Sequence, residues 1–312
     1  MNLRTTTWFV NGLPLTNGKT KIKKGGCIVN KLGIACILFS LVLMLGTASE
    51  VPAGTIKIAG STTLLPLSQL WAEAFMSKHP DVSISVTGGG TGVGISALLN
   101  GTCDIANASR EAKAKEIATA RQRNVKLTAI KCAKDGLAII VHPSNNVKNL
   151  TLAQLRDIYS GKVRTWDQVG GKSKAEIVVV GRDSASGTYG FFQEAVLGGG
   201  QYRADMLSQA TNAAVAQTVS QSPNAIGYVG MAYAWGLSKK GKLEVVSVSR
   251  KKGEPGILPK EETVANGSYP LFRYLYMYTA GKPSGLVKQF IDFGLSSEGQ
   301  ALVPKSGYIS LK

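Results

Sequence analysis

The stretch IVVVGRDSASGTYGFF, residues 177–192, shows the pattern that decides the fold. Its β-branched run 177–180 predicts a strand, the Gly/Ser/Thr-rich residues 181–188 predict a turn, and the aromatic residues beyond them predict a helix. The same order of strand, turn and helix begins at TIKIA, residues 55–59, and again at VSISV, residues 82–86. Strands that alternate with helices in this way predict an α/β fold.

Each of the three turns is suited to bind an oxyanion. A helix start leaves backbone N–H groups unpaired and carries partial positive charge. Glycine lets an anion approach the backbone, and Ser or Thr adds a hydroxyl donor. Ordinary helix capping is the simpler explanation of any one such turn. Three turns together, with Arg182 in the last and a further strand that ends at Ser109-Arg110, favour a shared anion site where strand ends meet helix starts.

The N-terminal segment predicts export. Residues 1–48 hold six Lys or Arg and no acidic residue, and the apolar run 32–45 precedes Gly46-Thr47-Ala48-Ser49. A basic segment, a short apolar core and small residues form a secretory signal, with cleavage predicted after Ala48. The alternative, a membrane anchor, needs about 20 apolar residues, whereas this run has about 14.

Charge and cysteine content exclude some classes of function. After the signal, 30 Lys and Arg stand against 19 Asp and Glu. The basic residues are scattered and are not interleaved with aromatic residues, so nucleic-acid binding is not expected. Cys103 and Cys132 predict either one disulfide in an oxidising compartment or two buried thiols. Two cysteines and two distant histidines lack the spacing of a zinc site, and no cofactor is expected.

Two segments imitate enzyme motifs without completing them. Gly171-Lys172-Ser173 lacks the earlier glycine of a phosphate-binding P-loop, because Trp166 stands at that position. Ser186 is not in the G-x-S-x-G turn of a hydrolase, because Ser184 occupies the first glycine position. The chain is therefore expected to bind its ligand without catalysis, and a phosphatase is a distant alternative.

Residues 55–311 resemble the phosphate-binding proteins of the high-affinity phosphate ABC transporters. The segments that carry the resemblance span nearly the whole mature sequence. They are AGSTTLLPL near Gly60, GGGTGVG near Thr91, DIANASR at 104–110, YSGKVRTWDQVGG at 159–171, RDSASGT at 182–188, AIGYVGMAYA at 225–234, YPLFRYLYMYT at 269–279 and FIDFGLSSEGQALVPKSGYISL at 290–311. Each segment alone is ordinary, but together they are highly specific.

The resemblance implies a two-lobed periplasmic-binding-protein fold. Each lobe would be a mixed sheet flanked by helices, and two crossover strands, Gly136–His142 and Tyr274–Thr279, would join the lobes. The implied parts follow in chain order: a signal peptide at 1–48, the first part of lobe one at 49–137, lobe two at 138–272, and the return to lobe one at 273–312.

The resemblance also implies a function and a site. The chain would be a periplasmic, monomeric substrate-binding component that captures inorganic phosphate in the interlobe cleft and delivers it to the permease of an ABC transporter. The residues at the positions of the family's phosphate ligands are Thr62, Thr63, Thr91, Ser109, Arg110, Arg182, Ser186, Gly187 and Thr188. Arg182 would pair with the dianion, since a planar guanidinium can donate two parallel charge-assisted bonds. A receptor for another oxyanion, such as sulfate or molybdate, is the alternative.

Two positions depart from the best-known pattern of the family. Well-known members have aspartates, which accept the proton of hydrogen phosphate, where this chain has Arg110 and Ser184. The neighbouring Asp183 is the candidate for the missing acceptor. We therefore expect phosphate to be preferred, but sulfate to be excluded less strictly than at a site that carries those aspartates.

Overall fold

The computed structural model describes residues 54–312, so the predicted signal peptide lies outside the described residues. The strands are β1 (Gly54–Gly60), β2 (Val82–Gly89), β3 (Ile105–Ala108), β4 (Leu127–Val141), β5 (Asn149–Thr151), β6 (Val178–Arg182), β7 (Leu207–Gln209), β8 (Ala225–Gly230), β9 (Glu244–Ser249) and β10 (Phe272–Ala280). The helices are α2 (Leu65–Lys78), α3 (Thr91–Leu99), α4 (Ala114–Gln122), α5 (Leu152–Ser160), α6 (Gly187–Ala195), α7 (Asn212–Gln221), α8 (Met231–Ser238), α9 (Glu261–Ala265), α10 (Gly285–Leu295) and α11 (Ser297–Leu302), with short 3-10 turns at Trp166–Val169 and Pro304–Ser306.

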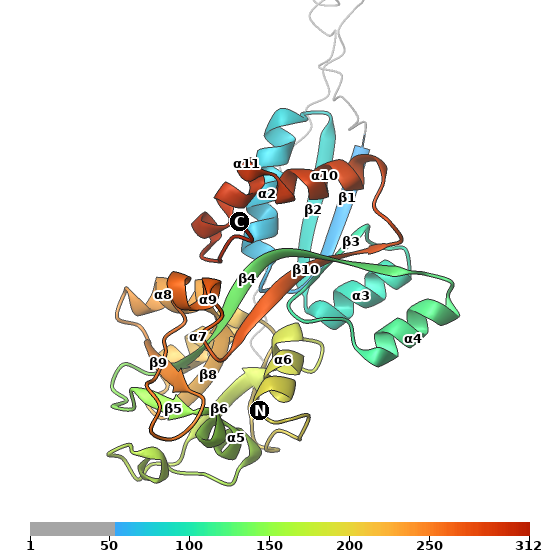
Figure 1. The fold of residues 1–312 in the computed structure, drawn as a ribbon. Helices are drawn as coiled ribbons and strands as arrows, with labels where there is room; N and C mark the ends of the chain where they lie inside the picture. The colour runs from blue at the N-terminus through green and yellow to red at the C-terminus, as the bar shows by residue number, and fades with distance from the viewer. Residues whose placement is uncertain (1–53) are drawn as a thin grey trace, which may run out of the picture. The chain divides into compact units, whose positions relative to one another are not determined.

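The strands form two mixed groups that share β4 (Figure 1). In the first group, β1 runs parallel to β2 and β3, and β10 runs antiparallel to β3 and β4. In the second group, β4 pairs with β8 and β9, β8 pairs with β6, and β6 pairs with β7. Helices lie against both groups, so the predicted fold of two mixed-sheet lobes is confirmed.

Strand β4 changes its partner between Gly136 and Leu137. Residues up to Gly136 pair with β10, and residues from Leu137 pair with β8. β4 and β10 are therefore the crossover strands, and they are longer than predicted because they pair with each other from Leu127 to Gly136 before β4 enters the second lobe. The lobe boundaries at 137/138 and 272/273 remain predictions, and the first of them lies beside this change of partner.

Buried aromatic residues tie the C-terminal helices to the first lobe. Trp71 and Phe75 lie on the buried face of α2, at the spacing of one helical turn that an amphipathic helix requires. Phe75 packs edge-on against Phe290 of α10, with ring centroids 5.6 Å apart, and the indole N–H of Trp71 donates to the carbonyl of Gly299 at 2.7 Å. The end of the chain thus returns to the lobe in which the described residues begin.

A second aromatic group fixes α6 in the other lobe. Phe192 of α6 stacks on Tyr228 of β8 with ring centroids 4.3 Å apart, and Tyr159 of α5 packs against both rings. The hydroxyl of Tyr228 also accepts from the backbone N–H of Arg182 at 3.3 Å. Such stacked aromatic groups add about 0.5–1.5 kcal/mol per pair beyond their burial. They hold the end of β6 and the start of α6 in a fixed relation.

The two cysteines of the described residues are free thiols, so the disulfide alternative is wrong and the alternative of two buried thiols is confirmed. The sulfur of Cys103 lies 3.7 Å from the carbonyl oxygen of Gly94, whereas the sulfur of Cys132 lies 3.4 Å from that of Leu275. Burial raises the pKa of the Cys103 thiol to about 11, which keeps it protonated at neutral pH.

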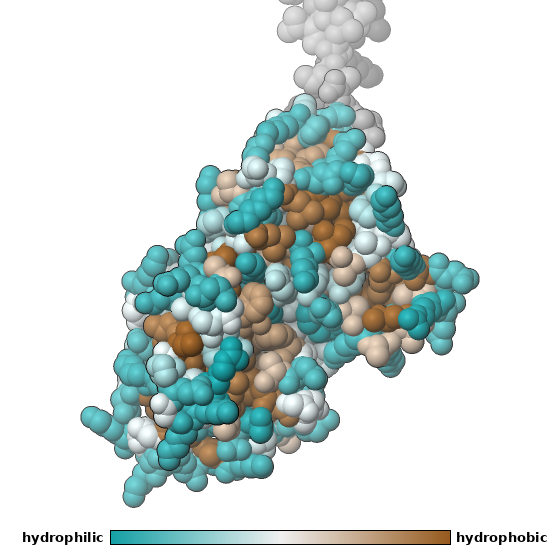
Figure 2. Space-filling view, viewed as in Figure 1, coloured by the Kyte–Doolittle hydropathy of each residue, from teal (hydrophilic) through white to brown (hydrophobic). Residues whose placement is uncertain are grey.

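The visible face of the molecule is mostly hydrophilic, with smaller hydrophobic patches between the helices (Figure 2). No helix in residues 54–312 combines the length and the apolar character needed to cross a membrane.

Candidate anion-binding site

The starts of α3 and α6 meet at a glycine. A Cβ atom on Gly187 would lie 2.2 Å from Oγ1 of Thr91 and 2.5 Å from Oγ of Ser109. Such distances leave no room for any side chain, so only glycine allows this approach. The structure thereby brings together one residue of the second lobe and two of the first, from three of the four segments that the sequence singled out.

Buried hydroxyl groups surround this contact. Oγ1 of Thr63 lies 3.1 Å from Oγ1 of Thr188, and Oγ1 of Thr91 accepts from the backbone N–H of Ser109 at 3.1 Å. We call these four residues, Thr63, Thr91, Ser109 and Thr188, the hydroxyl cluster, and the side chain of each is fully buried. Ser186 lies beside the cluster, where its Oγ caps α6 by accepting from the backbone N–H of Thr188.

Two tyrosines hold the turn that precedes α2. The hydroxyl of Tyr233 donates to the carbonyl of Thr62 at 2.8 Å, and that of Tyr308 donates to the carbonyl of Thr63 at 2.6 Å. The backbone N–H of Thr63 donates to Oγ of Ser61 at 3.2 Å. Both carbonyls and this N–H are therefore occupied within the chain, whereas each threonine hydroxyl can still donate its proton to a ligand.

Arg182 is buried at the end of β6, with only 1% of its surface exposed. Its Nε donates to the carbonyl of Gln209 at 3.1 Å, and its Nη2 donates to the carbonyl of Ala210 at 2.7 Å. Burial lowers the pKa of this guanidinium, while the negative charge of Asp183 acts in the opposite direction. A cation held by backbone carbonyls keeps its positive charge free to attract an anion.

Arg110 is also buried, but its guanidinium is bound to an acidic residue. Nη1 and Nη2 lie 2.7 and 2.8 Å from the two carboxylate oxygens of Glu116, and Nη1 also donates to the carbonyl of Glu111. The carboxylate of Glu116 accepts the backbone N–H of Lys113 as well, which fixes the start of α4. The structure thus directs Arg110 toward α4.

Asp183, the candidate proton acceptor, caps its own turn. Its Oδ1 accepts from the backbone N–H groups of Ala185 at 2.9 Å and Ser186 at 3.1 Å. This local arrangement is the one by which aspartate usually stabilises turns and helix starts.

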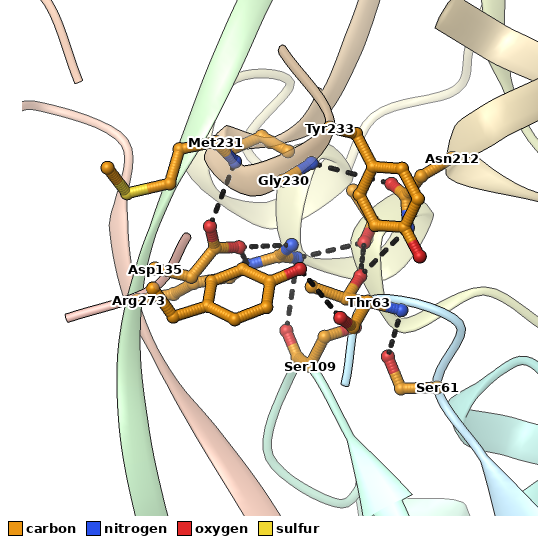
Figure 3. Close-up of polar contacts among 12 residues, drawn as sticks. Ser61, Thr63, Ser109, Asp135, Asn212, Gly230, Met231, Tyr233 and Arg273 are labelled. Atoms are coloured by element: carbon orange, nitrogen blue, oxygen red, sulfur yellow. Dashed lines mark hydrogen bonds and ion pairs between the residues drawn. The ribbon is translucent and has the colours of Figure 1, made fainter. Parts of the chain in front are cut away.

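A charged pair that the sequence did not indicate lies beside the hydroxyl cluster. Nε of Arg273 on β10 donates to Oδ2 of Asp135 on β4 at 2.8 Å, and both side chains are buried. Nη1 of Arg273 donates to Oγ1 of Thr188 at 3.0 Å and to the carbonyl of Ser109 at 3.2 Å. Figure 3 shows Arg273 between Asp135 on one side and Ser109 and Thr63 on the other. No local pattern marks this pair, because its partners are 138 residues apart.

Asn212, the first residue of α7, is a second site residue that was not predicted from the sequence. Its Nδ2 donates to Oγ1 of Thr62 at 3.3 Å and to Oγ1 of Thr63 at 3.2 Å. Here a signal was available: Thr211 caps the helix after the short strand β7, so this is a fourth strand-to-helix turn like the three that were recognised.

The assembled groups can bind an oxyanion. All nine predicted site residues are buried, and the groups bonded to the hydroxyl cluster are backbone amides, the side-chain amide of Asn212 and the guanidinium of Arg273. Among the described residues, buried Oγ of Ser109 and Nη2 of Arg273 have no hydrogen-bond partner, although buried polar groups are nearly always paired. Residues 54–312 contain no cluster of three or more His, Cys, Asp or Glu that could hold a metal ion.

The chain matches a known protein family over most of its length. A family model described as a PBP superfamily domain matches residues 46–298. A curated relative from Pseudomonas aeruginosa strain PAO1, named phosphate-binding protein PstS, is 36% identical over 83% of this chain and 84% of its own length. The protein of the same name from Bacillus subtilis strain 168 is 32% identical over 83% of this chain and 82% of its own length.

A solved structure matches in the same way. It is described as a putative phosphate ABC transporter substrate-binding protein with bound phosphate from Clostridium perfringens. It superposes with a TM-score of 0.72 at 35% identity, covering 83% of this chain and all of the other. The chain therefore belongs to the PBP superfamily and, within it, to the family of phosphate-binding proteins, which are substrate-binding transport proteins and not enzymes.

Proposed function

We propose that this chain captures inorganic phosphate between its two lobes and delivers it to the permease of an ABC transporter. The observation that carries the proposal is the buried hydroxyl cluster, which joins helix starts of both lobes and has an arginine bonded to it. Taking a dianion out of water is costly unless many donors replace its hydration. This site offers hydroxyls, helix-start amides and buried guanidinium groups together.

The proposed direct ligands are eight of the nine residues predicted from sequence: Thr62, Thr63, Thr91, Ser109, Arg182, Ser186, Gly187 and Thr188. The hydroxyls and the amides at the starts of α3 and α6 would donate to the phosphate oxygens, and Arg182 would supply charge. Both Nη atoms of Arg110 are bound to Glu116 and one also to the carbonyl of Glu111, which leaves only the buried Nε without a partner among the described residues. We therefore assign Arg110 to the stability of the start of α4.

Phosphate bound in this way would favour the closed arrangement of the lobes. Ligands from both lobes around one anion stabilise closure by the difference in affinity between the closed and open forms. The lobes also touch directly, because the backbone N–H of Gly92 donates to the carbonyl of Ala185 at 2.9 Å. We propose that the permease recognises the closed form, so that loaded protein is selected for transport.

Calorimetric titration tests the proposal. The chain, purified without its first 48 residues and stripped of bound anion by unfolding and refolding, is titrated with phosphate, arsenate, sulfate and molybdate. We expect the tightest binding for phosphate and no turnover of a chromogenic phosphate ester. Tighter binding of sulfate or molybdate would replace the proposal with a receptor for that oxyanion.

Arg182→Ala extends the test to a single proposed ligand. Removing a buried charged donor from an ion pair costs roughly 2–5 kcal/mol, so phosphate affinity is expected to fall by more than tenfold. An affinity within about threefold of the unmodified chain, or about 0.7 kcal/mol, would remove Arg182 from the site.

Location and assembly belong to the same proposal. We propose that the protein works in the periplasm as a monomer after cleavage behind Ala48. N-terminal sequencing of the exported protein tests the cleavage site, and the native mass in solution tests the monomer. Recovery of uncleaved chain from the membrane fraction would favour the anchor alternative.

A further inference from the structure

We propose that Arg273 is a direct ligand of the bound oxyanion and that Asp135 is the residue that positions it. The inference rests on the proposed function and adds to it a cation that neither the sequence pattern nor the resemblance indicated. In this assignment, Arg273 and Arg182 are the two cations of the site, and Arg273 takes the place that the resemblance gave to Arg110.

The guanidinium of Arg273 contacts two different groups of residues. One edge faces Asp135, with Nε and Nη2 at 2.8 and 2.7 Å from the same carboxylate oxygen. The other edge faces the hydroxyl cluster, where Nη1 donates to Thr188 and to the carbonyl of Ser109. A planar guanidinium carries more N–H donors than these contacts use. Arg273 can therefore keep its carboxylate partner and bind an anion at the same time.

Hydrogen-bonding capacity is unmet beside the guanidinium of Arg273. Nη2 of Arg273 forms an ion pair with Asp135 at 2.7 Å but donates no well-aligned hydrogen bond, and the hydroxyl of Ser109 has no hydrogen-bond partner among the described residues. Only 4% of the surface of Arg273 and none of that of Ser109 is exposed. Arg273 and Ser109 are in contact. Buried donors whose hydrogen-bonding capacity is unmet lower the stability of the folded chain. An oxyanion oxygen between them would satisfy both.

Neighbouring groups fix the orientation of the Arg273 side chain. Asp135 and Arg273 stand directly opposite each other in the register of the antiparallel strands β4 and β10. Oδ1 of Asp135 also accepts from the backbone N–H of Met231 at the start of α8, at 3.1 Å. The ring of Phe191 covers the guanidinium from α6, at 5.3 Å from Cζ to the ring centroid. A carboxylate, a helix start and an aromatic ring thus fix the orientation of one side chain, as a preorganised site requires.

Asp135 and Arg273 lie at the connection between the two lobes. Asp135 immediately precedes the point at which β4 changes its partner from β10 to β8. The proposed ligand and its support therefore lie on the two crossover strands, where the chain passes between lobes. A bound anion would contact both lobes and the connection between them.

A set of variants tests the assignment. Arg273→Gln removes the charge but leaves Asp135 buried without its partner, so this variant can fail to fold. The double variant Asp135→Asn/Arg273→Gln replaces both charged groups with neutral polar groups, so neither charge is left buried without its partner. Arg203→Gln is the matched control, because Arg203 is a buried arginine paired with Asp205 away from the cluster. Thermal unfolding establishes which variants are folded, and calorimetry measures their affinity for inorganic phosphate.

We expect the folded double variant to bind phosphate at least thirtyfold more weakly than the unmodified chain, and Arg203→Gln to bind within threefold. A double variant that is folded and binds phosphate within threefold overturns the inference while leaving the proposed function intact. An unmodified chain that binds none of the four oxyanions overturns the proposed function and the inference together.

The role of Asp135 has its own readout. If Asp135 acts only by positioning Arg273, then Asp135→Asn weakens phosphate binding, but by less than the double variant does, because Arg273 keeps its charge. Binding by folded Asp135→Asn that is within threefold of the unmodified chain, or weaker than that of the double variant, would overturn the positioning role.

Discussion

Two buried arginines near the lobe interface each pair with a carboxylate, and the two pairs differ in what they leave free. Arg110 and Glu116 are six residues apart, and the guanidinium places both of its Nη atoms on the carboxylate and one also on a nearby carbonyl. Arg273 and Asp135 are 138 residues apart, and the guanidinium places one edge on the carboxylate and the other on the hydroxyl cluster. The first pair closes a local turn, whereas the second presents a cation to a site.

The carboxylates of the two pairs also differ in burial. The side chain of Glu116 is 18% exposed, while that of Asp135 is fully buried. A fully buried ion pair repays its desolvation only with good geometry and additional hydrogen bonds, and Asp135 obtains one such bond from the backbone of Met231. Such a pair is a weak way to gain stability. Its position beside the hydroxyl cluster is therefore consistent with the proposed role in ligand binding.

The largest expected effect comes from removing the cation of the deeper pair. Arg273→Gln leaves a buried carboxylate without its partner, which costs about 3–5 kcal/mol of unfolding free energy at neutral pH. In Arg110→Gln, solvent reaches Glu116, so a loss of about 1–2 kcal/mol is expected, between the exposed and buried limits. Urea unfolding of both variants measures the difference. Equal losses would show that the two pairs are equivalent and would break the comparison.

Arg273→Gln and the double variant Asp135→Asn/Arg273→Gln are expected to differ in how their stability depends on pH. Burial raises the pKa of Asp135, and the charge of Arg273 opposes this rise, so Arg273→Gln is expected to raise that pKa further. A carboxyl that holds its proton to a higher pH in the folded state contributes stability below its unfolded pKa and loses it as the pH rises through its folded pKa. The stability of Arg273→Gln should therefore fall from about pH 4 upward, by up to about 1.4 kcal/mol per pH unit. The double variant with Asp135→Asn should lack this dependence.

The next largest effect is expected from two glycines of α6. Gly187 faces the hydroxyl cluster, and Gly190 faces Arg110. A Cβ on Gly187 would meet hydroxyls of the cluster at 2.2 and 2.5 Å, whereas a Cβ on Gly190 would meet Cδ and Nε of Arg110 at 3.0 and 3.2 Å. The hydroxyls of Thr91 and Ser109 stand on short, fully buried side chains with little room to move, whereas the long Arg110 side chain can shift. We expect Gly187→Ala to weaken phosphate binding at least tenfold and Gly190→Ala to change it less than threefold. The reverse order would place the ligand on the side of Arg110.

The hydroxyl cluster could be predicted from sequence because its parts are local. Each of Thr63, Thr91, Ser109 and Thr188 stands where a strand ends in a Gly/Ser/Thr turn or at Ser109-Arg110. The chemistry of a helix start depends on a few consecutive residues. The resemblance then indicated that these turns meet at one site, and the structure brings all four residues together.

The charged pair could not be predicted because it depends on register. Asp135 and Arg273 meet only because β4 and β10 pair as antiparallel strands with these residues opposite each other, and a shift by one residue would turn both side chains to the other face. Arg110 shows a different limit. Its place in the sequence matches the third contact segment, but Glu116, in the first turn of α4, sets the direction of its guanidinium.

A smaller effect is expected for phosphate binding by Arg110→Gln. Because its guanidinium is occupied by Glu116 and by the carbonyl of Glu111, the variant should bind phosphate within about threefold of the unmodified chain, or about 0.7 kcal/mol. Its cost should appear in stability instead. Calorimetry separates the two, and a loss above tenfold would return Arg110 to the set of ligands.

The smallest effect is expected for Asp183→Asn, which tests whether a carboxylate in the turn before α6 governs selectivity. Oδ1 of Asp183 already accepts two backbone N–H groups, and the amide oxygen of asparagine can accept the same two bonds. The variant should therefore change stability and phosphate affinity by no more than the ~0.5 kcal/mol typical of neutral substitutions, and should leave the ratio of phosphate to sulfate affinity unchanged. A carboxylate that accepted the proton of hydrogen phosphate would behave differently, because its loss would weaken phosphate binding and remove the repulsion that excludes sulfate. Parallel titrations with the two anions distinguish these results. If the ratio shifts by more than tenfold toward sulfate, the acceptor is Asp183 despite its place in the turn; if it does not shift, discrimination between the two anions must come from groups nearer the crossover strands, where Asp135 is the buried carboxylate beside the cluster.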